Sequence, residues 1–416
     1  MRARIETACL WLVATAASLF LAFHFTLVMD YAVDGGPTIH ALLHGDLGHL
    51  PQPAMGPFSI LLRLPFAWLA RGHSQLLEYR LGAVPCILAA GALGVHLARR
   101  ALDAGRSRLF ALGIVLFAVL NPANFHAMAN GHPEEILGGA LCVAAVVAAS
   151  EGRSLLVTAA LLGLALATKQ WAVVAIGPVL LAAPRRRLGV ALTGIALAAA
   201  LTLPLMLSNP GGFATTTRTS AGATVGLTPA SLWAPFEHVR HVRIFDGVAH
   251  RTIERRYMSP LLAGNAKKLI VVLAALLPLA YWWRRRRPRA EDALILLALL
   301  LALRCGLDPL TTAYYTAPLL LALLAHEVMH ERGPPVLTTI AGAVIWYLTA
   351  RTVWVIEPDK VTAIFLGWMV PLLAYLAARL YASSVTSALG KWLSTSLPSS
   401  VTITRSSIRT PNAPGR

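Results

Sequence analysis

Residues 265–289, NAKKLIVVLAALLPLAYWWRRRRPR, join an apolar run of membrane-spanning length to a block of arginines. A transmembrane helix needs about 20 mainly apolar residues, because each residue adds about 1.5 Å and the hydrocarbon core is about 30 Å thick. Arginine next to a span usually stays on the cytoplasmic side of the membrane. This stretch therefore predicts both a membrane-spanning helix and the direction in which it crosses.

Apolar runs of similar length recur along the chain. The composition is 56% hydrophobic and 13% charged, whereas a soluble domain carries roughly 25% charge. A backbone in lipid must satisfy its own hydrogen bonds, so a span is a helix or part of a closed barrel, and Leu- and Ala-rich runs of this length favour helices. We therefore predict an all-α, polytopic membrane protein with about twelve transmembrane helices. The approximate cores of the predicted spans are 8–29, 76–98, 108–127, 134–150, 154–168, 171–183, 188–208, 265–283, 290–306, 311–329, 335–355 and 361–382.

The gaps between these spans alternate in chemistry. One set holds arginine blocks, at Arg99-Arg100, Arg185 to Arg187 and Arg284 to Arg287, and the other set holds acids, histidines and amides. If the first run is an uncleaved span with its N-terminus inside, each of these blocks falls on the cytoplasmic side. We therefore expect a multi-pass protein of the plasma membrane, with both termini cytoplasmic and the active face extracytoplasmic. The formal net charge of +17 then reflects topology and membrane lipids rather than nucleic-acid binding.

Two long segments fall on the predicted outer side, 30–75 and 209–264, and loops of this length are usually functional or disordered. Within the first, the apolar residues 56–70 are interrupted by Arg63 and Pro65, which predicts a helix lying in the outer interface rather than a span. We expect residues 1–390 to form one transmembrane domain and the Ser/Thr-rich residues 391–416 a disordered cytoplasmic tail. All four cysteines fall in or beside apolar runs, which predicts neither a disulfide framework nor a zinc site.

The first outer segment opens with two carboxylates and continues with histidines. Asp30 and Asp34 follow the first span directly, where desolvation and a fixed position suit a general base; the alternative is an ordinary solvated cap. His40 and His44 are spaced i,i+4 and can share one helix face. That pair fits a metal site, a substrate contact or a polar interfacial helix, and the sequence defines no clear third metal ligand.

Residues 130–135, Asn-Gly-His-Pro-Glu-Glu, form the tightest polar turn in the chain. They supply His132, Glu134 and Glu135, and a charge inside a bilayer costs roughly 2.5–3.5 kcal/mol at the centre and less near the surface. The turn is therefore either a capped hairpin or a functional site. Lys169-Gln170 lies between two short apolar runs, where the lysine either pairs with a phosphate or with Glu134 or Glu135, or extends to the interface.

The last polar cluster on the outer side lies late in the chain. Arg304 and Asp308 are spaced i,i+4 at the end of a predicted span, and Tyr314 and Tyr315 follow. One interpretation is an intrahelical ion pair beside an aromatic belt. The other is an arginine directed at a phosphate, because the planar guanidinium fits that group.

This arrangement resembles the GT-C membrane glycosyltransferases, and most nearly glycosyltransferase family 87, the polyprenyl-phosphate-mannose-dependent mannosyltransferases. The likeness covers most of the spans as architecture and rests on four places. These are Asp30/Asp34 followed by an outer amphipathic segment, Gly131-His132 with Glu134, Ala167-Thr168-Lys169, and Asp308-Pro309 ahead of Tyr314-Tyr315.

The resemblance implies transfer of a sugar, with mannose as one candidate, from a polyprenyl-phosphate donor to a hydroxyl of a lipid or glycan acceptor at the outer face. It implies Asp34 as the catalytic base with Asp30 second, Lys169 and Arg304 as partners of the leaving phosphate, and His132 as a ligand of substrate hydroxyls. No cofactor is expected, and a divalent metal is not indicated. The other substrate-binding candidates are Glu134, Glu135, Gln170, Asp308, Tyr315 and His44.

Two other classes of function are compatible with the same composition. A transporter or lipid flippase should carry polar residues at the bilayer midplane, often on broken helices, whereas the carboxylates here gather at the outer ends. A scaffold without chemistry has no need to concentrate Asp, Glu, His and Lys on one face. Convergence of Asp34, His132, Lys169 and Arg304 on one site would favour the enzyme.

Overall fold

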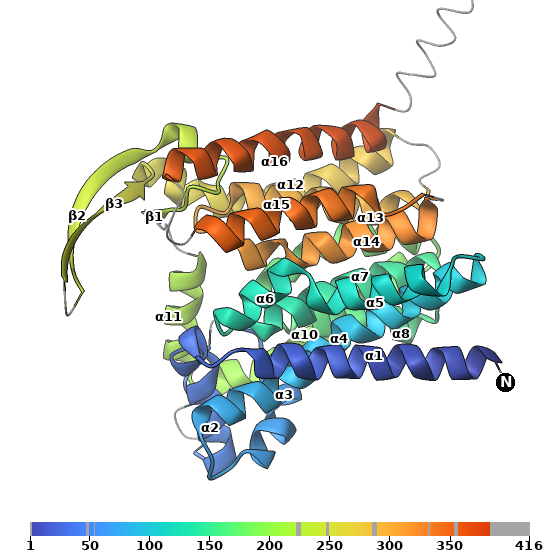
Figure 1. Ribbon diagram of the computed structural model, residues 1–416, viewed down its shortest axis with the longest axis horizontal. Helices are drawn as coiled ribbons and strands as arrows, with labels where there is room; N and C mark the ends of the chain where they lie inside the picture. Colours follow the sequence, from blue (N-terminus) through green and yellow to red (C-terminus); the bar gives the residue numbers. More distant parts are fainter. Residues whose placement is uncertain are drawn as a thin grey trace, which may run out of the picture.

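The computed structural model describes residues 2–46, 50–53, 55–221, 226–246, 249–284, 289–331, 333–352 and 357–382. Long helices lie side by side along the longest axis of the molecule (Figure 1). The elements are α1 (Arg2–His24), η1 (Met29–Ala32), α2 (Gly35–His44), α3 (Pro57–Leu69), α4 (Gln75–Asp103), α5 (Arg108–Leu120), α6 (Pro122–Ala129), α7 (Pro133–Ser150), α8 (Leu155–Leu166), η2 (Gln170–Ala175), α9 (Ile176–Ala182), α10 (Arg187–Ser208), α11 (Pro210–Ala221), β1 (Gly226–Leu227), η3 (Ala234–Phe236), β2 (His238–Asp246), β3 (Ala249–Tyr257), α12 (Pro260–Arg284), α13 (Asp292–Leu307), η4 (Ala313–Thr316), α14 (Ala317–His330), α15 (Val336–Thr352) and α16 (Pro358–Tyr381).

The prediction of a helical membrane protein is confirmed. Each predicted apolar segment coincides with a helix or with a pair of short helices in series, such as α5 with α6. Within the part of the chain that the structure describes, 7 helices are long and apolar enough to cross a membrane. Other apolar helices are shorter, and the break at Lys169 separates two of them, Leu155–Leu166 and Gln170–Ala182.

The two ends of the bundle differ as the charge alternation predicts. The N-terminus and the last residues of α16 lie at one end, and α2, α3, α11 and the strands lie at the other (Figure 1). Arginines from separate loops gather at the first end: Arg108 pairs with Glu6 at 2.6 Å, and Arg186 donates to the carbonyl of Arg153 at 3.3 Å. We refer to this as the arginine-rich end.

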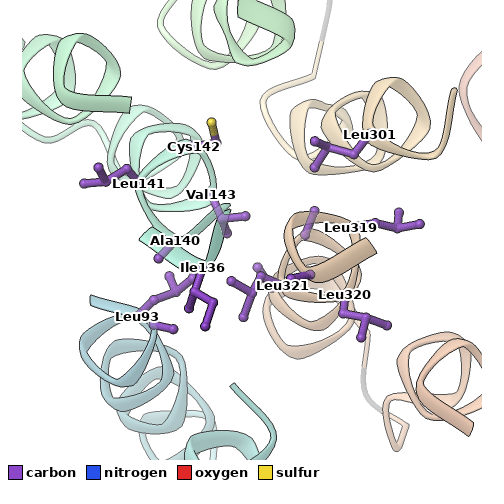
Figure 2. Packing of buried hydrophobic residues seen from close by; sticks show 14 of the residues in the cluster. Leu93, Ile136, Ala140, Leu141, Cys142, Val143, Leu301, Leu319, Leu320 and Leu321 are labelled. Carbon is purple, nitrogen blue, oxygen red and sulfur yellow. The ribbon is translucent and has the colours of Figure 1, made fainter. Parts of the chain in front are cut away.

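Helix α7 is the centre of the bundle. Ile136 on α7 faces Leu321 on α14, and Leu93 on α4 and Leu301 on α13 belong to the same core (Figure 2). Packing between helices in lipid depends on close van der Waals contact, for which small residues are needed. A Cβ on Gly139 would lie 2.9 Å from the Cα of Pro318, so this glycine lets α7 and α14 approach.

The first outer segment is folded onto the bundle. Residues 56–70 form a helix as predicted, α3, which continues through Pro65, and the Arg63 side chain is fully buried. Gly56 and Phe58 donate backbone hydrogen bonds to the carbonyls of Thr168 and Ala167 at 2.8 and 3.0 Å. The start of α3 therefore satisfies carbonyl groups at the end of α8, directly before Lys169.

The second outer segment holds secondary structure that the sequence analysis did not predict. After α11, three antiparallel strands form a sheet in the order β1-β3-β2, and β2 with β3 extends from the end of the bundle (Figure 1). Residues 238–246, HVRHVRIFD, are rich in the β-branched and aromatic residues that favour strands. This enrichment was the feature of the sequence from which the strands could have been predicted. The predicted tail at 391–416 lies outside the described residues.

We expect Gly56→Ala to destabilise the protein by about 1–3 kcal/mol, the typical cost of overpacking. A Cβ at this position would lie 2.1 Å from the carbonyl oxygen of Ala167, which is backbone and cannot move aside. The check is the thermal unfolding midpoint of purified protein in detergent. Gly367→Ala on α16 is the matched control, since its Cβ would meet nothing within 4 Å. Equal midpoints for the two variants would contradict this prediction.

Candidate active site

The turn before α7 places three titratable side chains at the start of that helix. Pro133 occupies the first helical position, His132 is the N-cap residue, and Glu134 and Glu135 lie in the first turn, where the positive end of the helix dipole favours acids. Gly131 has φ +86°, and a Cβ there would lie 2.6 Å from the backbone nitrogen of Tyr31. A glycine is thus required for the turn to pack against η1, which carries Asp30.

These side chains join others in a continuous series of ion pairs. His132 links two carboxylates, with Nε2 3.0 Å from Asp30 Oδ2 and Nδ1 2.8 Å from Glu134 Oε1. The Lys169 Nζ lies 3.1 Å from Glu134 Oε1 and 3.6 Å from Glu135 Oε1. Glu135 Oε2 in turn lies 3.3 Å from Arg304 Nη2. We call these residues the ion-pair cluster: Asp30, His132, Glu134, Lys169, Glu135 and Arg304.

Exposure falls along the cluster from one end to the other. The Asp30 side chain is 57% exposed, His132 is 10% exposed, and Glu134 is fully buried. Buried charges are tolerated only when they are paired, because each loses its hydration. Asp30 is therefore the solvent-exposed member of the cluster, and the other members are charged or polar side chains that lie mostly buried behind it.

The charges of two members follow from their neighbours. Burial lowers the pKa of His132, but the Glu134 carboxylate outweighs this effect, so the pKa lies above its ordinary value. Burial also lowers the pKa of Lys169, but Glu134, Glu135 and Asp34 together raise it further than burial depresses it. Lys169 is therefore a fixed positive charge at neutral pH, and Asp34 lies near enough to act on it.

Arg304 is held between two aromatic rings. Its Cζ lies 4.3 Å from the ring centroids of both Trp171 and Tyr315, and its Nη1 donates to the Tyr315 carbonyl at 3.2 Å. Trp171 also donates from Nε1 to Glu135 at 3.1 Å. The i,i+4 spacing suggested an ion pair with Asp308, but the structure pairs Arg304 with Glu135, and Asp308 accepts from the backbone of Leu310.

The other predicted residues differ in how close they come to this cluster. Asp34 is the half-buried N-cap residue of α2, and Tyr315 contacts Arg304. Gln170 is exposed at the first position of η2. His44 is not brought to the cluster: its ring contacts that of His40 in a tilted arrangement, with centroids 4.3 Å apart, and it lines a separate cavity between α2 and α4. Among the described residues, no three His, Cys, Asp or Glu side chains are placed to hold a metal ion.

Sequence reasoning missed two residues of the site. Arg63 is fully buried, with Nη1 3.9 Å from Glu134 Oε2 and Cζ 4.8 Å from the centre of the Tyr31 ring. An arginine inside an apolar helix on the predicted outer side was the signal, since such a charge is usually functional. Tyr314, read as part of an aromatic belt, stacks on His132 at 4.8 Å.

An apolar groove begins beside the cluster and runs along the bundle. It has a volume of about 380 Å³ and lies between η2 with α9 and the facing side of α12. Val173 lines it, two positions after Trp171, and Arg187 and Trp282 line it toward the arginine-rich end. The arrangement thus combines an accessible carboxylate, buried cations and an apolar channel, which suits group transfer from an amphiphilic anion.

Comparison with known proteins gives a family-model match and one similar solved structure. The model of glycosyltransferase family 87 matches residues 56–305. No curated protein sequence matches the chain. Among solved structures, the chain is similar to the archaeal oligosaccharyltransferase AglB from Archaeoglobus fulgidus, in complex with an inhibitory peptide and a dolichol-phosphate, with a TM-score of 0.40 and 12% identity. The match covers 90% of this chain and 55% of that one, so the chain spans about half the length of that structure.

The family match covers more than half of the chain and includes the turn before α7, Lys169 and Arg304. The membrane architecture and the resemblance drawn from the sequence agree with it. The chain belongs to glycosyltransferase family 87.

Proposed function

We propose that the protein transfers a sugar from a polyprenyl phosphate to an acceptor hydroxyl at the ion-pair cluster. The carrying observation is the cluster itself: three distant segments bring Lys169, Arg304 and the α7 acids together behind the exposed carboxylate of Asp30. Family membership supports a membrane glycosyltransferase with a lipid-linked donor. The cluster lies at one end of the bundle, which favours glycosyl transfer over the transporter or flippase alternative.

Asp30 is the proposed base. A general base must come within about 2.6–3.2 Å of the proton that it removes, and Asp30 is the exposed member of the cluster. It takes the proton of the acceptor hydroxyl as that oxygen bonds to the anomeric carbon, and the bond from the anomeric carbon to the phosphate oxygen breaks. Asp34, the first candidate from the sequence, is half-buried four residues on and is the alternative base.

Lys169 and Arg304 are proposed to stabilise the leaving polyprenyl phosphate. Negative charge develops on that phosphate as the bond breaks, and preorganised cations in a water-poor site stabilise it strongly. Both cations are held in place by Glu134 and Glu135, so they need little reorganisation when the donor binds. His132, with its raised pKa, can donate to a substrate hydroxyl or to Asp30.

The apolar groove is the proposed site of the donor's polyprenyl chain. It starts at η2, next to Lys169, and its lining is almost wholly aliphatic between Val173 and Trp282. A polyprenyl chain there would place its phosphate beside Lys169. The arginine-rich end would face the cytoplasm by the usual preference of positive charge, so the reaction would occur at the outer face of the plasma membrane. Mannose is the proposed sugar, and a lipid or glycan the acceptor.

Asp30→Asn should lower sugar transfer by about 10²–10⁴-fold, the usual contribution of a general base. The assay is transfer from labelled polyprenyl-phosphate mannose in membranes that contain the protein, with donor binding measured in parallel and expected to persist. Asp103→Asn is the matched control, because that carboxylate is 60% exposed at the arginine-rich end. If Asp34→Asn lost transfer activity and Asp30→Asn kept it, the role of catalytic base would belong to Asp34. Full activity in both variants would remove the proposed base.

Arg304→Lys should lower kcat/KM for the donor by about tenfold or more, since lysine keeps the charge but loses the planar fork and its stacking. The variant keeps a cation beside Glu135, so the unfolding midpoint should change little. Arg153→Lys, at an exposed pair with Glu151, serves as the control for a change of the same chemistry. An unchanged kcat/KM in Arg304→Lys would show that this guanidinium does not bind the phosphate.

A further inference from the structure

A second polar cavity lies at the arginine-rich end of the bundle, remote from the ion-pair cluster. Its volume is about 530 Å³, and α13, α14 and α16 form its walls. Asp292 lines it, whereas Arg304 belongs to the cluster at the other end of α13, roughly 18 Å away along the helix axis. The polar lining consists of Arg289, Glu291, Asp292, His326, His330 and Arg379.

Two arginines supply hydrogen-bond donors to this cavity. Arg379 lies 3.6 Å from Glu331 Oε1, and Arg289 lies 3.5 Å from Glu291 Oε1. Both distances are long beside the usual 2.7–2.9 Å, approximately, of a charge-assisted hydrogen bond. A guanidinium has several N–H donors, so each arginine can bind a further oxygen such as that of a phosphate.

Among the residues that the structure describes, two carboxylates also line this cavity. Asp292 accepts a hydrogen bond from the Tyr281 hydroxyl, and Glu291 is exposed beside Arg289. A phosphate without an accompanying positive charge would be repelled by these acids. A ligand that carries both a phosphate and an ammonium group would satisfy the arginines and the acids together.

His326 is a buried wall of the cavity. It is 4% exposed, and its Nδ1 has no hydrogen-bond partner among the described residues. Its Nε2 lies 3.8 Å from Glu331, too far for a hydrogen bond, and its ring stacks on His330 at 5.3 Å. The Nδ1 atom is itself enclosed by protein, so His326 shapes the cavity wall rather than offering a donor to a ligand.

The cavity is open toward the surface of α16. Tyr375, Ala378 and Arg379 of that helix line it, and Val370 and Tyr375 are large exposed side chains on α16. An apolar surface of this kind in a membrane protein faces lipid. Acyl chains can therefore lie along α16 while a headgroup enters between α13 and α14.

We propose that this cavity binds the headgroup of a zwitterionic phospholipid of the phosphoethanolamine type. The phosphate binds Arg379 and Arg289, and the ammonium group binds Glu291 and Asp292. The site is independent of sugar transfer, because it lies at the opposite end of α13 from Arg304. It would fix the position of α16 against α13 and α14.

The experiment measures retained lipid on full-length protein purified from nanodiscs that contain equal phosphatidylethanolamine and phosphatidylglycerol. Native mass spectrometry is expected to show preferential retention of phosphatidylethanolamine. Arg289→Gln with Arg379→Gln should lower that retention by about tenfold or more, as expected for loss of a charge-assisted hydrogen bond. Arg153→Gln, a half-exposed arginine at the same end, is the control and should retain the lipid.

A second variant separates charge recognition from a general loss of fold. Glu291→Gln should lower the preference for phosphatidylethanolamine over phosphatidylglycerol, because it removes the partner of the ammonium group. Equal retention of both lipids by the wild-type protein would overturn the zwitterion assignment. Displacement of the lipid by equimolar glycerophosphoethanolamine would show that the acyl chains contribute nothing to binding and would overturn the lipid proposal. Unchanged retention in the double arginine variant would remove the site.

Discussion

The structure depends on the carboxylate of Glu134, which is fully buried at the start of the most central helix. A lone carboxylate at that depth would be strongly unfavourable, and the protein surrounds it with a histidine and two cations: His132 at 2.8 Å, Lys169 at 3.1 Å and Arg63 at 3.9 Å. Each of these side chains comes from an element that packs against the start of α7. The turn before α7, the end of α8 and the outer helix α3 meet because of this one charge.

The position of α7 explains why the charges meet there rather than at a lipid-facing surface. The helix packs against α14 through Gly139 and against Trp171 through Gly138, where a Cβ would lie 3.2 Å from the indole ring. Close backbone approach brings Trp171 and Arg304 beside Glu135. The small residues in the core therefore allow the close helix packing that brings the charged side chains together at its end.

Much of the architecture could be predicted from the sequence because its causes are local. The length of each apolar run indicates a membrane span, and the arginine blocks indicate which ends of the spans lie on the same side. A Gly-His-Pro-Glu turn indicates a helix that starts with polar residues. The partners of the charges could not be predicted, since Arg304 and Glu135 are 169 residues apart and the nearer Asp308 looked the better match. Arg63 was taken only as a break in an apolar run, because its burial against Glu134 depends on tertiary contact alone. The strands after α11 were missed because helical patterns dominate the rest of the chain.

The two backbone hydrogen bonds from Gly56 and Phe58 to Thr168 and Ala167 have a mechanical consequence. They join the outer segment that follows Asp34 to the residue that directly precedes Lys169. The first outer segment and the segment that carries Lys169 are thus coupled through the main chain, and separating them breaks these two hydrogen bonds. Any event that shifts the first outer segment is transmitted to Lys169 through the main chain rather than through flexible side chains.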